Sequence, residues 1–377
     1  MTELPRAEFA FPGPLRDRLV AAILAGEKTA TTALLREYQQ EGEALPRPGD
    51  RSVLVDSADR PCAVLQTTEV RVLSLAEMDL AHAVDEGEGF TDVAGWRHAH
   101  TQFWRSAPML AALGDVFTID DQTMVVAERF HVVERVWRCD EVSTAYATEG
   151  RAAVAALRSV PPETFRLPTR CQPWTVLDLL AHTVIALART DEMLDDRGAA
   201  GRDGAGLVGA VGYYAPDARF RADVDGTRVS DAQRWAAVRT PVGAVDELAR
   251  TTEAVAARVL AEGPDALVRT RHGDSMRLVD FQATRVVELA VHGVDLADGL
   301  GVAPWLTDPA ADLVAALATG TTQAPLRAAR AWDRPTLVRA VTGRGGPAGA
   351  DGVVPLPAGV RSPFFGGTHR PGLIGEE

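Results

Sequence analysis

The sequence predicts an α+β protein of several domains: a small β-barrel with helices, an antiparallel four-helix bundle, and a small irregular C-terminal extension. Three observations predict this. The chain has 377 residues, which is too long for one ordinary domain. Up to about residue 138, short apolar or β-branched runs separated by turns are typical of strands. From about residue 142, the apolar residues recur with a period near 3.6, which is typical of helices.

The composition excludes several classes of protein. The apolar fraction of 46% and the charged fraction of 24% are those of a folded domain. The net charge of -13 argues against a general polyanion binder, which needs a basic face. No apolar run reaches the ~20 residues that span a bilayer, and the N-terminus has no apolar leader segment. The three cysteines form no CxxC pair. We therefore expect a cytoplasmic protein without a membrane partner.

The first predicted domain covers residues 1–138. A helix is expected over 14–26, where apolar residues share one helical face and glycine follows. Strands are expected over 52–56, 61–75 and 123–136. Helical segments are expected after residue 75 and around 93–104. Strands with turns and few helices favour a small barrel with helical decoration.

The second predicted domain covers residues 142–302 and contains four amphipathic helices, over 145–160, 175–196, 241–263 and 278–301. The glycine-rich connection over 197–215 predicts either a mobile loop or a lid over a site. The extension over 303–377 is rich in glycine and proline. It contains a possible short strand at 336–341 and a tail that we expect to be partly disordered.

The first candidate site contains Lys28, the only lysine in a chain with 38 arginines. It lies where a helix ends and a strand begins, in the sequence Gly-Glu-Lys-Thr-Ala-Thr. A desolvated lysine can become a base, and it can activate a nearby threonine hydroxyl such as that of Thr31. The alternative is a surface lysine at a helix end, where it favours the helix dipole. Spacing alone does not decide between them.

This region resembles an ASCH domain, a PUA-like fold, from residue 8 to about residue 136. The G-x-K-T-x-T element and the Gly-Asp turn before a strand are the most specific parts of the resemblance. It implies RNA or modified-nucleoside chemistry. In one class of small members that removes the acyl group from N4-acetylcytidine, the catalytic lysine, threonine and glutamate match Lys28, Thr31 and Glu88 here. Ala33 stands where an arginine often follows this element.

The second candidate site lies on two of the helices of the bundle. Glu288 and His292 are four residues apart, so they project from one helical face, and His182 lies on another largely apolar helix. Burying such groups is costly unless they are satisfied, and a metal would satisfy them. Two histidines and a carboxylate are the ligands of a catalytic zinc site. The alternative is a helical ion pair between Glu288 and His292 beside a solvated histidine.

The helical region, over about residues 142–345, resembles the DinB-like, mycothiol-dependent maleylpyruvate isomerase family. The W-T-V-x-D-L-L-A-H and R-x-x-E-x-x-x-H-G-x-D motifs carry this resemblance. It implies that His182, Glu288 and His292 bind a divalent metal, normally zinc, with Asp295 as a partner behind them. It further implies mycothiol at the open position of the metal and isomerisation or conjugation through its sulfur. Arg285 and the 197–215 loop are candidates for binding the cofactor or substrate.

The function predicted from these features is a zinc-dependent, mycothiol-using transferase or isomerase acting on a small electrophile. Its appended ASCH domain would bind or deacylate a nucleoside. The alternatives are an RNA- or nucleotide-binding regulator with a structural or redox-responsive zinc bundle, and a scaffold with both sites decayed. The intact motifs argue against decay. The sequence indicates no oligomeric state.

Overall fold

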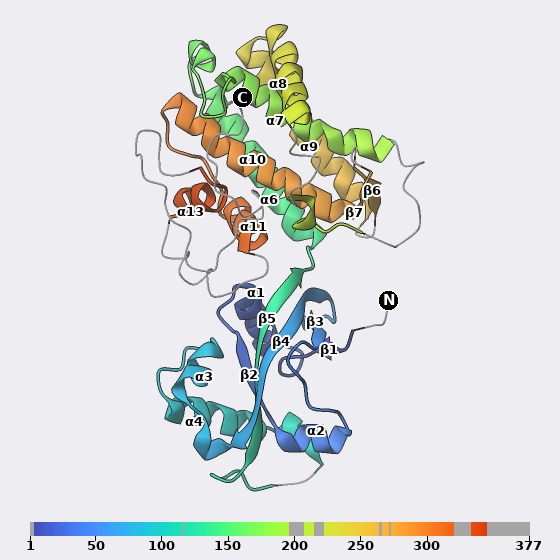
Figure 1. Ribbon diagram of the computed structural model, residues 1–377, viewed down its shortest axis with the longest axis vertical. Coiled ribbons are helices and arrows are strands. Elements are labelled where there is room, and N and C mark those ends of the chain that lie inside the picture. Colours follow the sequence, from blue (N-terminus) through green and yellow to red (C-terminus); the bar gives the residue numbers. More distant parts are fainter. Residues whose placement is uncertain are drawn as a thin grey trace. The chain divides into compact units, whose positions relative to one another are not determined.

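The computed structural model describes residues 4–114, 117–195, 207–214, 222–263, 266–270, 273–319 and 333–344 (Figure 1). These residues fall into two compact units. The first ends at Val136 and the second begins at Trp137. The first unit combines a sheet with helices, and the second is largely helical, so the α+β prediction holds at this level.

The first unit is organised around a five-stranded sheet with the strand order β1-β3-β4-β5-β2. Its strands are β1 (Arg6–Ala7), β2 (Ala30–Leu34), β3 (Arg51–Val55), β4 (Pro61–Ser74) and β5 (Met124–Arg135). Strand β1 pairs with β3 in parallel, and the other neighbours are antiparallel. The long strands β4 and β5 lie side by side in Figure 1.

The helices of the first unit cover two separate apolar cores. Helix α1 (Pro14–Leu24) packs against one of them, with Phe130 of β5 at its centre. Helices α3 (Leu80–Asp85), α4 (Val93–Trp104) and α5 (Ala107–Leu113) enclose the other, with the fully buried Trp96. Helix α2 (Leu35–Glu41) follows β2 directly. Strand β5 contributes to both cores, because successive residues of a strand point to opposite faces.

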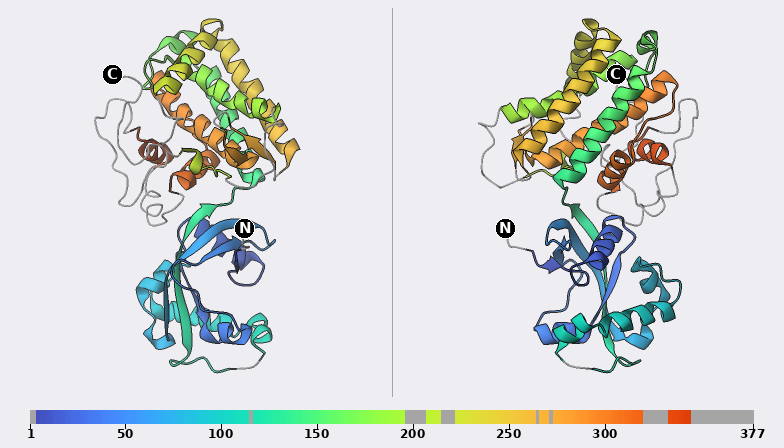
Figure 2. Two further views of the ribbon diagram at one scale, coloured as in Figure 1. Left: turned by 45° about the vertical axis from the view of Figure 1, so that its right-hand side comes forward. Right: turned by 180° about the vertical axis from the view of Figure 1, so that it is seen from behind.

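The second unit is built on four long helices, seen from two further sides in Figure 2. These are α6 (Cys139–Arg158), α7 (Val176–Asp195), α9 (Pro241–Glu262) and α10 (Leu278–Leu300). Both α6 and α7 pack against α9 and α10, while α8 (Ala222–Ala237) packs against α7. Apolar stripes with a period near 3.6 therefore meet in one interior, as the sequence predicts. Every helix predicted for this region is present, and α8 was not foreseen.

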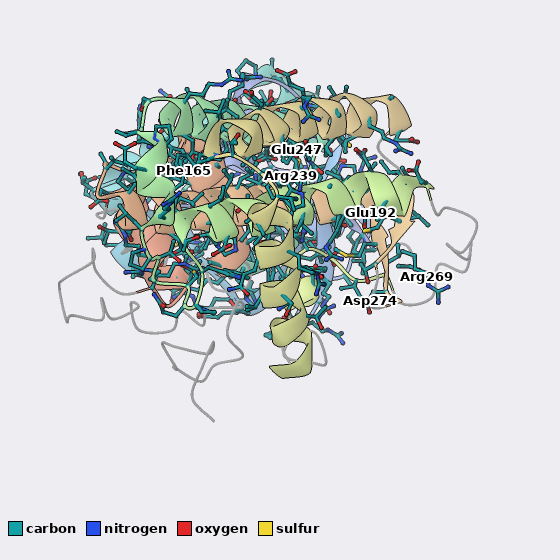
Figure 3. All side chains as sticks on the ribbon, turned by 90° about the horizontal axis from the view of Figure 1, so that it is seen from above. Phe165, Glu192, Arg239, Glu247, Arg269 and Asp274 are labelled. Carbon is teal, nitrogen blue, oxygen red and sulfur yellow. The ribbon has the colours of Figure 1, made fainter. Side chains whose placement is uncertain are left out.

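A small hairpin precedes α10. It pairs β6 (Leu267–Arg269) with β7 (Ser275–Arg277), and Figure 3 shows the side chains of Arg269 and Asp274 there. Two short one-turn helices, Pro162–Arg166 and Gly212–Tyr214, complete the connections. Of the predicted glycine-rich loop over 197–215, only residues 207–214 belong to the described residues, so its prediction as a loop or lid lies mostly outside them.

The extension contains helices where the sequence analysis expected irregular structure. Helix α11 spans Asp308–Thr319 and helix α13 spans Arg334–Val341. The predicted strand at 336–341 was therefore wrong. The side chain of Asp333 accepts a hydrogen bond from the Thr336 amide, and proline stands in the first turn, which together start a helix. No helix among the described residues combines the length and the apolar character that crossing a membrane requires.

Candidate functional site

His182 is held on α7 by a well-defined helix start. The Thr175 hydroxyl accepts a hydrogen bond from the Asp178 amide at 3.3 Å, and the Asp178 carboxylate accepts one from the Thr175 amide at 3.0 Å. This reciprocal cap fixes where the helix begins. The buried indole of Trp174 stacks on the His182 ring with centroids 4.7 Å apart. The imidazole is therefore held in one orientation by both its helix and its neighbour.

The structure brings all three predicted metal ligands together. Glu288 Oε2 lies 3.7 Å from His182 Nε2 and 3.3 Å from His292 Nε2. The two imidazole rings meet edge to face with centroids 5.1 Å apart. The possible ligand atoms of the three residues all lie within 4.8 Å of one another. Two ring nitrogens and one carboxylate oxygen thus converge on one point between α7 and α10.

The ionisation of Glu288 and of His182 suits a cation. Burial alone would raise the pKa of Glu288, but hydrogen bonds from His182 and His292 and the charge of Arg285 outweigh it and hold this pKa well below its usual value. Burial lowers the pKa of His182. An ionised carboxylate and a neutral imidazole are the states in which these side chains bind a metal. The donor set fits a divalent ion with nitrogen and oxygen ligands.

Two further side chains, Asp295 and Cys171, lie on the Nδ1 side of the His292 ring, away from Glu288. His292 Nδ1 is 3.1 Å from Asp295 Oδ2, and the Cys171 thiol donates to the same oxygen at 3.5 Å. Asp295 is fully buried. Because a carboxylate only accepts, Nδ1 carries a hydrogen. Burial would lower the pKa of His292, but hydrogen bonds with Asp295 and Glu288 outweigh it and hold that pKa well above its usual value, so a metal at Nε2 would have to displace the proton there. Sequence reasoning anticipated Asp295 through the resemblance and missed Cys171.

Arg285, the predicted cofactor-binding residue, is 2% exposed and has several protein partners. Its guanidinium donates to the Ala186 carbonyl at 3.0 Å and to the Tyr213 hydroxyl at 3.3 Å. It also lies 3.8 Å from Glu288 Oε1, the oxygen that faces away from the histidines. Arg285 therefore contacts the Glu288 carboxylate, and Tyr213 joins the end of the glycine-rich segment to Arg285. Binding of a cofactor by Arg285 stays a prediction.

The first unit contains a second constellation, around Lys28. The Lys28 side chain is 1% exposed, which overturns the surface-lysine alternative. Its ammonium donates to Glu88 Oε1 at 2.9 Å and to the Glu86 backbone carbonyl at 3.3 Å, and lies 3.4 Å from Glu86 Oε2. Phe9 lies beneath it, with 5.9 Å from the nitrogen to the ring centroid. The predicted partners Lys28 and Glu88 are thus in direct contact.

Glu86 is the centre of this constellation and was not among the predicted site residues. Its buried carboxylate accepts hydrogen bonds from the Thr32 hydroxyl at 2.7 Å and the Trp96 indole at 3.0 Å, and lies 3.1 Å from His100 Nε2. Burial would raise the pKa of Glu86, but the Lys28 ammonium and these hydrogen bonds outweigh it and bring the pKa to about 2. Glu86 is therefore a fixed negative charge beside Lys28.

Gly87 explains how two glutamates reach one lysine. Its φ is +68°, and a Cβ at this position would lie 2.4 Å from the Glu27 carbonyl oxygen. Only glycine allows both this conformation and this approach of the two backbones. The amide of Thr29 donates to the Asp85 carbonyl at 2.7 Å and ties the same two segments together. The Glu-Gly-Glu spacing in the sequence was the signal that could have placed Glu86 here.

Thr31 does not join this hydrogen-bond group. Within the described residues, no hydrogen bond links its hydroxyl to Lys28 or Glu88. Thr31 pairs with Glu128 across β2 and β5, and the next residue, Thr32, is the one that donates to Glu86. Because successive strand residues face opposite sides, Thr31 projects from the other face of β2 than Thr32. Its catalytic role stays a prediction.

Comparison with known families matches both units separately. The model of the ASCH domain matches residues 8–134. The model described as the mycothiol maleylpyruvate isomerase N-terminal domain matches residues 146–297. The second match includes His182, Glu288, His292 and Asp295, and it ends before α11 and α13. Among curated proteins, none matches the sequence significantly.

Three solved structures are similar to parts of the chain. An ASCH domain from Lactobacillus crispatus JV V101 is 28% identical, covering 36% of this chain and 82% of its own, with a TM-score of 0.32. A protein from Enterococcus faecalis V583 is 24% identical, covering 36% and 78%, with a TM-score of 0.31. A mycothiol-dependent maleylpyruvate isomerase is 15% identical, covering 57% and 92%, with a TM-score of 0.37.

Proposed function

We propose that the chain, whose two units match the models of an ASCH domain and of a mycothiol maleylpyruvate isomerase N-terminal domain, is a metal-dependent enzyme that uses mycothiol to isomerise or conjugate a small electrophile. The metal is a divalent ion, with zinc as the first candidate. Its ligands are His182, Glu288 and His292. The ASCH domain supplies a second site for a nucleoside.

The observation that carries this proposal is the convergence of two imidazole nitrogens on one carboxylate oxygen. Glu288 Oε2 lies within 3.7 Å of Nε2 of both His182 and His292. Three protein ligands leave one position of a tetrahedral ion open, which is the pattern of catalytic rather than structural zinc. The proposal of a purely structural zinc bundle needs a fourth protein ligand at this point.

The side chains around the ligands have distinct roles. Arg285 holds Glu288 Oε1, so that Oε2 faces the two histidines. Asp295 accepts from His292 Nδ1 and fixes the tautomer in which Nε2 can bind. Trp174 stacks on His182 and excludes water from one side of its ring. A divalent metal held here would lower the pKa of a thiol and present the thiolate as nucleophile.

Metal content and a thiol assay test this proposal together. We expect purified protein to retain or take up one divalent ion per chain, and His182→Ala to lose it. Metal-loaded protein should accelerate the reaction of mycothiol with maleylpyruvate or another small electrophile, and His182→Ala should not. Metal binding without any reaction would show that the protein binds a metal but does not catalyse the proposed reaction. Absence of metal from the wild type would overturn the proposal.

For the domain limits and folds, we propose a PUA-like barrel over residues 1–138 and a DinB-like four-helix bundle over residues 142–302, followed by the extension over 303–377. The division of the described residues at Val136 and Trp137 supports the first limit. The packing of both α6 and α7 against α9 and α10 supports the four-helix bundle.

A second activity is proposed for the ASCH domain, namely removal of the acyl group from a nucleoside such as N4-acetylcytidine. A buried lysine in contact with Glu86 and Glu88 supports it. Lys28 would act as general base, Glu88 would orient Lys28 or shuttle a proton, and Glu86 would keep a fixed negative charge beside both. The nucleophile would be the Thr31 hydroxyl or a water, and Thr31 lies outside the hydrogen-bond group of the other residues.

Release of cytidine from N4-acetylcytidine tests this second activity. We expect release by the wild type and none by Lys28→Ala. If neither protein releases cytidine, the deacylase proposal fails. Binding of the nucleoside without release, measured by calorimetry, would instead favour a binding module, and salt-dependent binding of RNA would favour the regulator.

A further inference from the structure

The buried carboxylate of Asp295 needs a compensating positive charge, and a segment outside its own helix supplies one. Asp295 has a fully buried side chain one turn after His292 on α10. Two of its hydrogen-bond partners are His292 Nδ1 and the Cys171 thiol. An ionised carboxylate in the protein interior is costly unless a positive charge compensates it. The group that carries this positive charge therefore holds Asp295 in place, and Asp295 in turn holds the His292 ring.

The compensating charge comes from Arg344, at the end of the extension. Arg344 Nε lies 2.8 Å from Asp295 Oδ1 and 3.0 Å from Oδ2. The family match ends at residue 297. The group that fixes Asp295 thus lies outside the matched domain.

Arg344 is placed by several contacts. Its amide donates to the Arg339 carbonyl at 2.7 Å, which closes the turn after α13. Its own carbonyl accepts a hydrogen bond from Arg170 Nη1. The helix itself is held to α10 by Arg339, whose guanidinium lies 2.5 Å from Asp298 Oδ1. The extension therefore reaches α10 at two carboxylates, of which only Asp295 contacts a predicted metal ligand.

Arg344 bears on whether the side chains behind His292 bind a second metal ion or only orient the His292 ring. Cys171, His292 and Asp295 form a second group whose ligand atoms lie within 4.8 Å of one another. A guanidinium against both oxygens of Asp295 supplies the positive charge that a second ion would bring. The thiol and the imidazole then act as donors to Asp295. The group behind His292 is an anchor for the ligand and not another metal site.

We infer that Arg344 is a positioning residue of the metal site: by holding Asp295 against His292 Nδ1, the extension sets the affinity of the His182–Glu288–His292 group for its metal. This inference rests on the proposed function, because it presumes a metal at those ligands. It adds a role for a segment that lies beyond residue 297, where the matched domain ends. Partners behind a ligating histidine orient its ring and raise its basicity.

The test is the zinc affinity of the full chain, measured by competition with a coloured chelator. We expect Arg344→Gln to weaken zinc binding by about 10- to 100-fold, the usual effect of removing such a partner. Arg339→Gln is the matched control. It removes another buried arginine of the extension that pairs with α10, and it should lower thermal stability while leaving zinc affinity unchanged. The cobalt-loaded protein gives a second readout, because Arg344→Gln should shift the visible absorption bands and Arg339→Gln should not.

Wild-type zinc affinity in Arg344→Gln, or an equal loss in Arg339→Gln, would overturn the inference. If Arg344→Gln does not fold, Arg344→Lys decides. Lysine keeps the charge but has no Nε–H to lie against both oxygens, so we expect about tenfold weaker zinc binding. Unchanged affinity in that variant would contradict the inference. If the wild type itself binds no metal, the proposed function fails, whereas equal binding by wild type and Arg344→Gln defeats the inference alone.

Discussion

Glu288 Oε2 lies 3.3 Å from Nε2 of His292, while the other oxygen of the same carboxylate lies 3.8 Å from Arg285. One carboxylate thus faces a histidine pair with one oxygen and an arginine with the other. The arrangement orients a negative charge toward the point where the two imidazole nitrogens meet. This relationship is the basis of the metal-dependent function proposed here.

Removing the charge of Glu288 should weaken metal binding without unfolding the helices. Glu288→Gln keeps the size of the side chain but loses the anionic ligand. We expect zinc to raise the thermal unfolding temperature of the wild type by several degrees, since a ligand that binds only the folded state stabilises it. The variant should show little or no shift. Glu253→Gln, an exposed position on α9, is the control and should respond to zinc as the wild type does.

Replacing Lys28 by arginine should abolish any deacylase activity. Arginine keeps the positive charge beside Glu86 and Glu88, but its guanidinium does not deprotonate in proteins and cannot act as a base. The measurement is cytidine release from N4-acetylcytidine. Arg18→Lys, an arginine–lysine exchange at an exposed position of the same unit, should leave the rate unchanged. Full activity in Lys28→Arg would mean that Lys28 contributes only charge.

Acid should destabilise the first unit through Glu86. Burial would raise the pKa of Glu86, but Lys28 and the hydrogen bonds bring it to about 2, below the value in an unfolded chain of about 4.3. A carboxyl group with a depressed folded-state pKa stabilises the fold fully above the unfolded pKa. That contribution is lost as the pH falls from about 5 toward 2.

Glu86→Gln tests this dependence. The variant should be less stable than the wild type at pH 7, because Lys28 loses a buried partner. The difference in free energy of unfolding should shrink as the pH is lowered from about 5 toward 2. Urea titrations at several pH values measure it, with the exposed Glu43→Gln as control. A difference that stays constant over this range would show that Glu86 does not carry the acid dependence.

Gly87→Ala should displace the segment that brings Glu86 and Glu88 to Lys28. The new Cβ would lie 2.4 Å from the Glu27 carbonyl oxygen, and neither backbone can yield easily. Gly42→Ala is the matched control, since Gly42 has the same φ of +68° but nothing within 4 Å of a Cβ. We expect Gly87→Ala to cost about 1–3 kcal/mol more, the usual cost of overpacking. Equal costs would mean that the close approach is not needed.

The helices of the second unit could be predicted from sequence because their apolar stripes repeat over many turns. The predicted 175–196 and 278–301 agree closely with α7 (Val176–Asp195) and α10 (Leu278–Leu300). The error at 336–341 has a local cause. The short run over 336–341 was interpreted as a strand, while the signal for a helix lay just before it in the Asp333 cap. Closure of the sheet into a barrel stays a prediction.

The residues of the candidate sites could be predicted where they lie on one helix or strand, or where they match the motif of a family that the sequence resembles. Glu288 and His292 share a helical face by spacing alone. The contacts of Arg344 with Asp295, and of Glu86 with Lys28, join residues 49 and 58 positions apart. No periodicity encodes such pairs, since they depend on how the elements pack. For the same reason the sequence could not separate Thr31 from Thr32 as the partner of the buried carboxylate.

The most direct test of the metal-dependent account is an anomalous difference map, recorded at the zinc edge from crystals of the zinc-loaded full chain. The account predicts one strong peak at bonding distance from His182 Nε2, His292 Nε2 and a carboxylate oxygen of Glu288, with Asp295 still against Nδ1. A map without a peak between these three side chains, in protein that contains zinc, would contradict it.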